Sequence, residues 1–248
     1  MEKTRWQLFV GMGLVILSAV FYVLHYLIFR DPHHIFLYLI GDIAFVFIEV
    51  LLVTLIIHEL LNQREKRARF EKLNMVIGIF FSEVGTKLLN FLSARDPHLE
   101  EIPKELLNKD GWSEKNVSRL GEQLNRYDYG LEIQNEDFRQ LKVLLDDKKD
   151  FLLRLLENPN ILEHESFTDV LRAVFHLAEE LDYREDLEKL PNSDRTHLAG
   201  DMKRAYRFLA YQWLFYMGHL KSNHPYLFHL AIRMNPFDRD ASPIVKDS

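Results

Sequence analysis

The chain has 248 residues, a hydrophobic fraction of 48% and a formal net charge of −6 at pH 7. This acidic balance argues against general binding to nucleic acid. The chain contains no cysteine, which excludes disulfide bonds, thiolate chemistry and cysteine-ligated zinc and fits a reducing compartment.

The first two predicted elements are helices long enough to cross a bilayer. Residues 6–29 and 35–57 are apolar runs that each exceed the roughly 20 helical residues needed to cross a bilayer core. The short connection "RDPHH" between them predicts an antiparallel hairpin. A signal peptide is the competing interpretation of the first run. That run is longer than a signal sequence's apolar region of about 7–15 residues and ends without a small-x-small cleavage site.

Basic residues near the two runs predict the orientation of the hairpin. Lys3 and Arg5 precede the first run, and the basic segment "REKRARFEK" follows the second, whereas the connection carries only Arg30 beside Asp31. The excess of Lys and Arg outside the connection predicts that both termini are cytoplasmic. The basic segment could also contact anionic lipid headgroups, at about 1 kcal/mol per residue, but orientation explains it more simply.

The second run carries two carboxylates, Asp42 and Glu49. Seven residues turn a helix through about 700°, so the two side chains lie within about 20° of one face. On the first run Ser18, Tyr22 and His25 share a face as well. Counting outward from the connection places Asp42 level with Tyr22 and His25, and Glu49 within reach of Ser18. These five residues are therefore the predicted intramembrane polar site.

Three interpretations of these carboxylates stay open. The favoured one is polar pairing inside the hairpin or between subunits, because a charge at mid-membrane costs at least about 2.5–3.5 kcal/mol unless it faces protein or water. The second is an oligomer in which rings of Asp42 and Glu49 line a cation path. The third is a proton-linked or lipid-headgroup role, or a protonated carboxyl group that only packs.

Residues 64–97 are predicted to form a membrane-proximal helix or stalk. Up to about residue 93 only Gly78 and Gly85 could interrupt a helix that continues from the second span. The apolar stretch 73–81 is too short to span, and we expect it to be buried in the cytoplasmic domain.

The remaining chain has helical periodicity without a convincing alternating strand. Ser113, Asn135 and Ser166 are the predicted N-caps of three helices, the second of which is expected to run unbroken to a stop at Pro159. Residues 205–220 are apolar and aromatic on every side, which predicts a central buried helix.

A final helix should follow, with Pro225 at its first position. The segments "GDIAFVFIEVLLVTLII", "LNMVIGIFFSE" and "HPYLFHLAIRMNPF" resemble an uncharacterised family of prokaryotic two-span membrane proteins. The resemblance covers most of the chain and implies the same hairpin and helical cytoplasmic domain. It implies no activity.

Two further groups are candidate sites in the helical region. Asp169, His176 and Glu180 lie in line on the polar side of one predicted helix, where they form either a divalent-metal site or a solvated face. His229 and Arg233 are one turn apart and could meet an acidic ligand, although a histidine satisfied by a carbonyl is the commoner case.

We therefore expect an all-α protein made of a transmembrane hairpin followed by an α-helical cytoplasmic domain. Its expected segments are the two-helix hairpin at 1–63, the stalk at 64–97, the all-α cytoplasmic domain at 98–237 and a C-terminal tail at 238–248.

For function we favour a non-enzymatic, membrane-anchored assembly or signalling module in the cell (inner) membrane. It would self-associate through the hairpin and the cytoplasmic helices. Its expected partners are the lipid bilayer, further copies of itself and a cytoplasmic protein, with no cofactor. The alternatives are a small cation-conducting or ion-coupled oligomer and a metal-dependent membrane-associated enzyme. The sequence has no P-loop, Rossmann glycine pattern, nucleophile elbow or His-Glu-x-x-His motif, so no catalytic residue is assigned.

Overall fold

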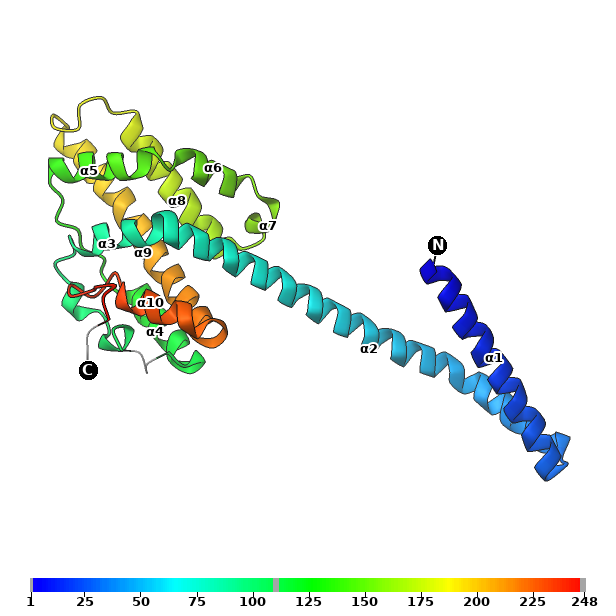
Figure 1. Cartoon of the computed structure of the whole chain (residues 1–248). Coiled ribbons are helices and arrows are strands. Elements are labelled where there is room, and N and C mark those ends of the chain that lie inside the picture. Colours follow the sequence, from blue (N-terminus) through cyan, green and yellow to red (C-terminus); the bar gives the residue numbers. More distant parts are fainter. Residues whose placement is uncertain (1, 109–111, 246–248) are drawn as a thin grey trace. The chain divides into compact units, whose positions relative to one another are not determined.

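The computed structural model describes residues 2–108 and 112–245, and over these residues it contains helices and no β-strand (Figure 1). The all-α fold class predicted from the sequence is confirmed. The chain divides into two compact units, one ending at Arg67 and the other beginning at Ala68. Helix α2 contributes residues to both units.

The first unit is a pair of helices joined by a tight turn. Helix α1 (Glu2–Phe29) is followed by Arg30, whose φ of 49° lies in the left-handed region that reverses the chain after a helix. Helix α2 (Pro32–Phe80) begins with Pro32, and the Asp31 carboxylate accepts a hydrogen bond from the backbone N–H of His33. By length and composition both helices are able to cross a membrane.

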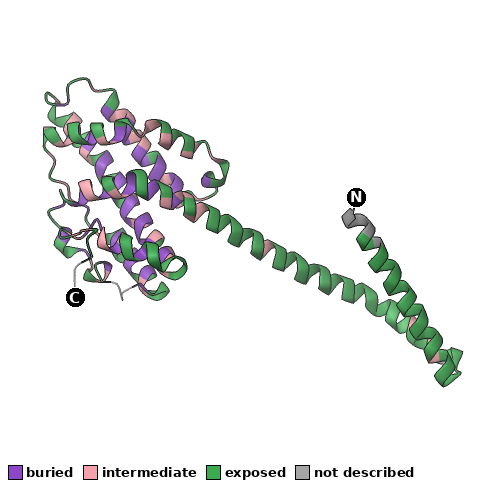
Figure 2. Ribbon diagram, viewed as in Figure 1, coloured by how far each residue is buried: buried purple, intermediate pink, exposed green. Residues whose placement is uncertain are grey.

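Nearly every apolar side chain of the first unit is exposed. Among the described side chains from Trp6 to Leu60, only His25, Ile35 and Leu39 are partly covered (Figure 2). This unit therefore has no core of its own.

The second unit is a helical domain built from the C-terminal end of α2 and the elements that follow it. These are a π-helical turn (Phe81–Gly85), α3 (Thr86–Ser93), two 3₁₀ turns (Leu99–Glu101 and Lys104–Leu106), α4 (Glu114–Arg126), α5 (Asn135–Asp146), α6 (Lys149–Leu156), α7 (Pro159–Leu162), α8 (Glu165–Asp182), α9 (Asn192–Asn223) and α10 (Pro225–Arg233).

Helix α9 is the centre of this domain and packs against α3, α4, α8 and α10 (Figure 1). Trp213, near its middle, is buried and lies edge-on to the rings of Trp112 and Phe237. The prediction of a central buried helix over 205–220 is confirmed. Arg207 and Phe215 are exposed within this stretch, Phe215 at 38%.

The predicted stalk contributes side chains to the core of the second unit. Ile77, Phe80 and Phe81 are buried, as expected for the apolar stretch 73–81, but Met75 and Ile79 in the same stretch are 63% and 48% exposed. The helical chain does continue to Ser93, but through a π-helical turn. Gly85 ends that turn, where an added Cβ would lie 2.6 Å from the ring of Phe81 and 2.7 Å from that of Phe80.

The predicted helix starts are partly correct. Ser113 caps α4 by accepting a hydrogen bond from the N–H of Asn116, and Pro225 begins α10. Asn135 does not cap α5, because the cap is Gln134 and the Asn135 side chain donates instead to the carbonyl of Glu188.

Two further predictions in this region were wrong. Ser166 does not cap α8, since His164 occupies that position and the Ser166 hydroxyl donates to Gln212. The helix expected to run unbroken from Asn135 is divided into α5 and α6.

Candidate functional site

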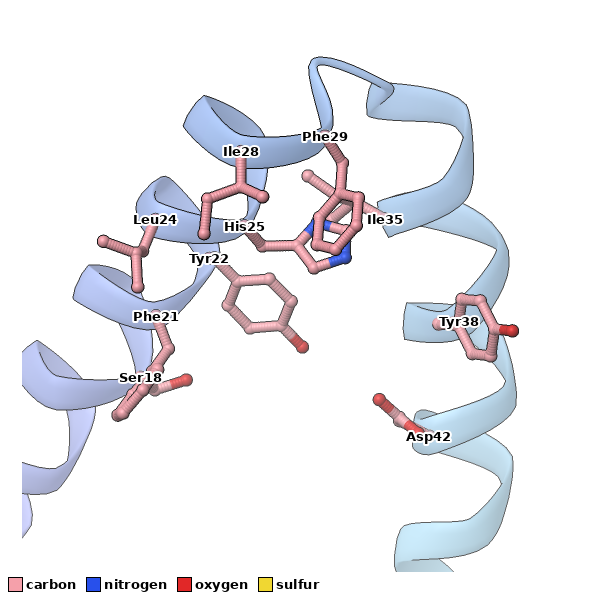
Figure 3. A pocket seen from close by; sticks show the side chains of 10 residues that line it. All are labelled: Ser18, Phe21, Tyr22, Leu24, His25, Ile28, Phe29, Ile35, Tyr38 and Asp42. Atoms are coloured by element: carbon pink, nitrogen blue, oxygen red, sulfur yellow. The ribbon is translucent and has the colours of Figure 1, made fainter.

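A pocket between α1 and α2 in the first unit brings together most of the predicted intramembrane polar site (Figure 3). Ser18, Tyr22 and His25 reach it from α1, and Asp42 reaches it from α2. The apolar and aromatic side chains around them are Phe21, Leu24, Ile28, Phe29, Ile35 and Tyr38.

The polar groups of the pocket face one another, but none of them forms a hydrogen bond with Asp42. Figure 3 shows the Tyr22 hydroxyl and the Asp42 carboxylate directed into the space between the helices. The ring of His25 lies 4.7 Å from the ring of Phe29, measured between centroids. Within the described part of the chain, Asp42 makes no hydrogen bond or ion pair with Tyr22 or His25, the two side chains predicted to lie level with it.

The pocket therefore offers an unsatisfied acceptor inside an apolar surface. Asp42 is exposed, and its carboxylate oxygens can accept hydrogen bonds or bind a cation. The phenol, imidazole and hydroxyl groups nearby are the donors available within the hairpin.

Glu49 does not line this pocket and is exposed on α2. Helices α1 and α2 diverge with distance from their connection (Figure 1). Counting outward from the connection therefore pairs residues of the two helices correctly near the turn, at Asp42. It does not do so farther from the turn, at Glu49.

In the second unit the predicted group of Asp169, His176 and Glu180 on α8 separates into two parts. Asp169 lies beside Arg172, with 3.9 Å between Oδ1 and Nη1. His176 and Glu180 approach each other at 3.8 Å between Nε2 and Oε1. Seven residues of helix span about 10 Å, so Asp169 is too far along α8 to share an ion with this pair. A hydrogen bond from Arg184 is the main cause that lowers the pKa of the Glu180 carboxyl.

His176 and Glu180 instead face His197 and Asp201 on α9. The sequence interpretation missed these two residues. The signal available was a second histidine followed by a carboxylate one helical turn later, in "HLAGD". Its significance becomes visible when α8 is packed against α9.

The predicted pair on α10 makes contacts of other kinds within the chain. His229 is exposed and lies edge-on to Phe228. The Nε of Arg233 donates to the carbonyl of Pro243 at 3.2 Å. Neither residue has an acidic partner among the described residues. Arg233 therefore holds the C-terminal segment against α10.

Comparison with known proteins gives a consistent division of the chain. Residues 2–61 match the family described as the N-terminal helical domain of MJ1433, and residues 69–233 match the one described as the C-terminal helical domain of the uncharacterized protein MJ1433. The protein from Methanocaldococcus jannaschii with that name is 47% identical over 247 residues, which cover 100% of this chain and 99% of that protein. No solved structure matches the chain. The gap between the two matched regions contains Arg67, where the first compact unit ends.

Proposed function

The chain belongs to the MJ1433 family, since it matches both the N-terminal and the C-terminal helical domain of that protein, and on that premise we propose that it is a membrane-anchored, non-enzymatic assembly or signalling module. The hairpin crosses the inner membrane twice and associates with further copies of itself. The second unit lies in the cytoplasm and binds a partner protein or other copies.

The observation that carries this proposal is the exposed apolar surface of the first unit. Ile40 and Phe47 are 70% and 74% exposed, and their neighbours on both helices are similar. Exposed apolar surface costs about 25 cal/mol per Å² in water, and a contiguous patch of this extent is rare on a soluble monomer. A bilayer covers the surface, and helices satisfy their backbone hydrogen bonds without water.

The charges that flank the two helices support a cytoplasmic position for both termini. Lys3 and Arg5 precede the apolar part of α1, and Arg64, Lys66 and Arg67 follow that of α2. Loops rich in Lys and Arg stay on the cytoplasmic side. The second unit follows directly on that side.

Self-association is supported by the unpaired Asp42 and by the glycines of the hairpin. An added Cβ at Gly11, Gly13 or Gly41 would meet no atom within 4 Å. Small residues permit the close approach of another helix in a membrane. A second copy that packs at Gly41 would lie beside Asp42 and could donate a hydrogen bond to its carboxylate.

The test is the oligomeric state of the full chain in lipid nanodiscs, measured by light scattering and by crosslinking through lysine side chains. We expect an oligomer for the parent and for Glu49→Gln. The combined change Asp42→Leu and Glu49→Leu should weaken association. Membrane hydrogen bonds average about 0.6 kcal/mol, which is roughly a threefold loss of association constant for each bond removed. Thr54→Leu on α2 is the control and should change nothing.

A monomeric parent, or full association of the double leucine variant, would contradict the assembly proposal. The runner-up function, a cation path lined by Asp42 and Glu49, predicts a different result. Cation flux into liposomes by the parent that disappears in Glu49→Gln would favour that path over assembly.

A further inference from the structure

Four side chains with metal-ligating atoms meet where α8 packs along α9, away from the hairpin pocket. Helix α8 supplies His176 and Glu180, and α9 supplies His197 and Asp201. We call these four residues the α8–α9 cluster. Each helix contributes a histidine and, one turn later, a carboxylate, so both members of each pair lie on one helical face. Metal sites in helical proteins are commonly built in this way from facing helices.

Four contacts of 3.4 to 3.8 Å link the two histidines to the two carboxylates. Asp201 Oδ2 lies 3.5 Å from His176 Nε2 and 3.4 Å from His197 Nε2. Glu180 lies 3.5 Å from His197 Nε2 through Oε2 and 3.8 Å from His176 Nε2 through Oε1. Glu180, His197 and Asp201 each offer one ligand atom such that all three lie within 4.8 Å of one another.

These distances decide between two accounts of the cluster. Protonated histidines that donate to carboxylates form hydrogen bonds of about 2.7–2.9 Å, and all four contacts are longer. Zinc bonds of about 2.0–2.1 Å in a tetrahedron place neighbouring ligand atoms about 3.3–3.4 Å apart. Three of the four contacts lie close to that separation. The spacing therefore matches ligands arranged around a cation better than side chains bonded to one another.

Asp201 provides an independent observation. Its side chain is 3% exposed, and among the described residues its buried Oδ2 has no hydrogen-bond partner. Its other oxygen, Oδ1, accepts a hydrogen bond from Arg204 Nη1 at 2.9 Å. This bond fixes the carboxylate with Oδ2 directed at the two imidazoles. A buried, unsatisfied carboxylate oxygen is costly unless a further group binds it.

Glu180 is also held from outside the cluster. Arg184 Nη1 donates to Glu180 Oε2 at 2.7 Å, while the rest of its guanidinium binds both oxygens of Asp194 at 2.7 and 2.6 Å. Each acidic member of the cluster is thus oriented by an arginine. Supporting hydrogen bonds of this kind orient the ligands in metal sites.

We propose that the α8–α9 cluster binds one Zn²⁺ ion, with His176, Glu180, His197 and Asp201 as its four ligands. Four protein ligands make a closed, structural site, so the ion clamps α8 to α9 and stabilises the second unit. His176 and His197 are 45% and 53% exposed. The ion therefore enters from solvent on the side of the imidazoles.

The experiment measures Zn²⁺ binding by the full chain in detergent, purified with a tag that contains no histidine and stripped with a chelator. Elemental analysis after titration with Zn²⁺ should give one ion per chain, and Zn²⁺ should raise the melting temperature. Asp201→Asn should lower the affinity by more than the about 10–100-fold expected for loss of a supporting residue. Asp169→Asn removes a carboxylate on α8 that lies outside the cluster, so it is the control and should bind like the parent.

Two further measurements keep the proposal testable if Asp201→Asn folds poorly. His197→Ala removes a half-exposed ligand, and its melting temperature should match the parent's without Zn²⁺ but no longer rise when Zn²⁺ is added. Co²⁺ in place of Zn²⁺ should give the intense visible absorption of a tetrahedral site. The assignment would be overturned if the parent bound no stoichiometric Zn²⁺ or if Asp201→Asn and Asp169→Asn bound Zn²⁺ equally well. A Co²⁺ spectrum typical of a six-coordinate site would overturn it as well.

Discussion

Phe47 and Phe80 lie on the same helix, α2, but in different units, and their surroundings are opposite. Phe47 is 74% exposed, whereas Phe80 is 0% exposed and contacts the rings of Phe81 and Phe167 edge-on. The second unit excludes water from its own apolar side chains and so carries its stability within itself. The first unit covers almost none of its apolar surface, so its stability depends on what surrounds it.

The carboxylates of the two units differ in the same way. Asp201 is buried in the second unit and is oriented by Arg204. Asp42 is exposed in an apolar surface and has no ion-pair partner among the described residues. In the second unit an arginine binds one oxygen of the buried carboxylate, whereas in the first unit no described residue pairs with Asp42.

The largest expected effect tests this contrast with two identical substitutions on α2. Phe80→Ala should destabilise the second unit by about 3–5 kcal/mol, as truncation of a buried phenylalanine does. Phe47→Ala should change the stability of the second unit by less than about 0.5 kcal/mol. Urea unfolding in detergent, followed by the fluorescence of Trp112 and Trp213, measures both. Equal losses would show that the two units do not unfold separately.

A smaller effect compares two glycines of the second unit. Gly85→Ala forces a Cβ against Phe80 and Phe81 at 2.7 and 2.6 Å, and overpacking of this kind costs about 1–3 kcal/mol. Gly200→Ala, on exposed α9 surface with no atom within 4 Å of the added Cβ, should stabilise by about 0.5–1 kcal/mol because alanine loses less entropy in a helix. Thermal unfolding of the two variants should therefore shift in opposite directions, and a shared direction would contradict the packing at the π-helical turn.

Features set by local periodicity were predictable from the sequence. The two long apolar helices, the buried face of α8 and the buried middle of α9 follow from the spacing of apolar residues. The buried face of α8 includes Phe167, Val170, Leu171, Val174, Ala178 and Leu181, which recur at helical spacing. Periodicity reports which side of a helix is apolar, and that side is what a core covers.

Features set by competition between neighbouring groups, or by packing at a distance, were not predictable in this way. Asn135 and Ser166 are good caps by residue type, but each has a tertiary hydrogen-bond partner that takes its side chain. Asp42 lines the pocket with the polar residues of α1 because it lies near the turn. Glu49 lies outside the pocket because α1 diverges from α2, and the apolar pattern of either helix alone does not indicate this divergence.

The α8–α9 cluster illustrates the same limit. His176 and Glu180 were recognised as candidates, but Asp169 was grouped with them because it shares their face. A shared face does not bring side chains within reach when they are two turns apart along the axis. The residues that do complete the cluster are contributed by another helix.

The smallest expected effect concerns His164, which caps α8. Its Nδ1 accepts a hydrogen bond from the backbone N–H of Phe167 at 3.3 Å, and only a neutral ring accepts there. Partial burial lowers the pKa of this imidazole from its ordinary value of 6.5. As the pH falls the unfolded chain therefore takes up the proton first. The contribution of the cap is fully present above the unfolded pKa and is lost as the pH falls through the folded one.

His164→Asn keeps a capping oxygen but removes the titration. It should unfold like the parent near pH 8 and lose less stability than the parent between about pH 7.5 and pH 5.5. The difference should not exceed about 1 kcal/mol, the typical value of one N-cap. His229→Asn on the exposed side of α10 is the control for the substitution itself, since its ring caps no helix, and near pH 8 it should unfold like the parent. Because every other histidine is common to the parent and His164→Asn, identical pH slopes for these two proteins would show that the cap at α8 does not depend on the neutral ring.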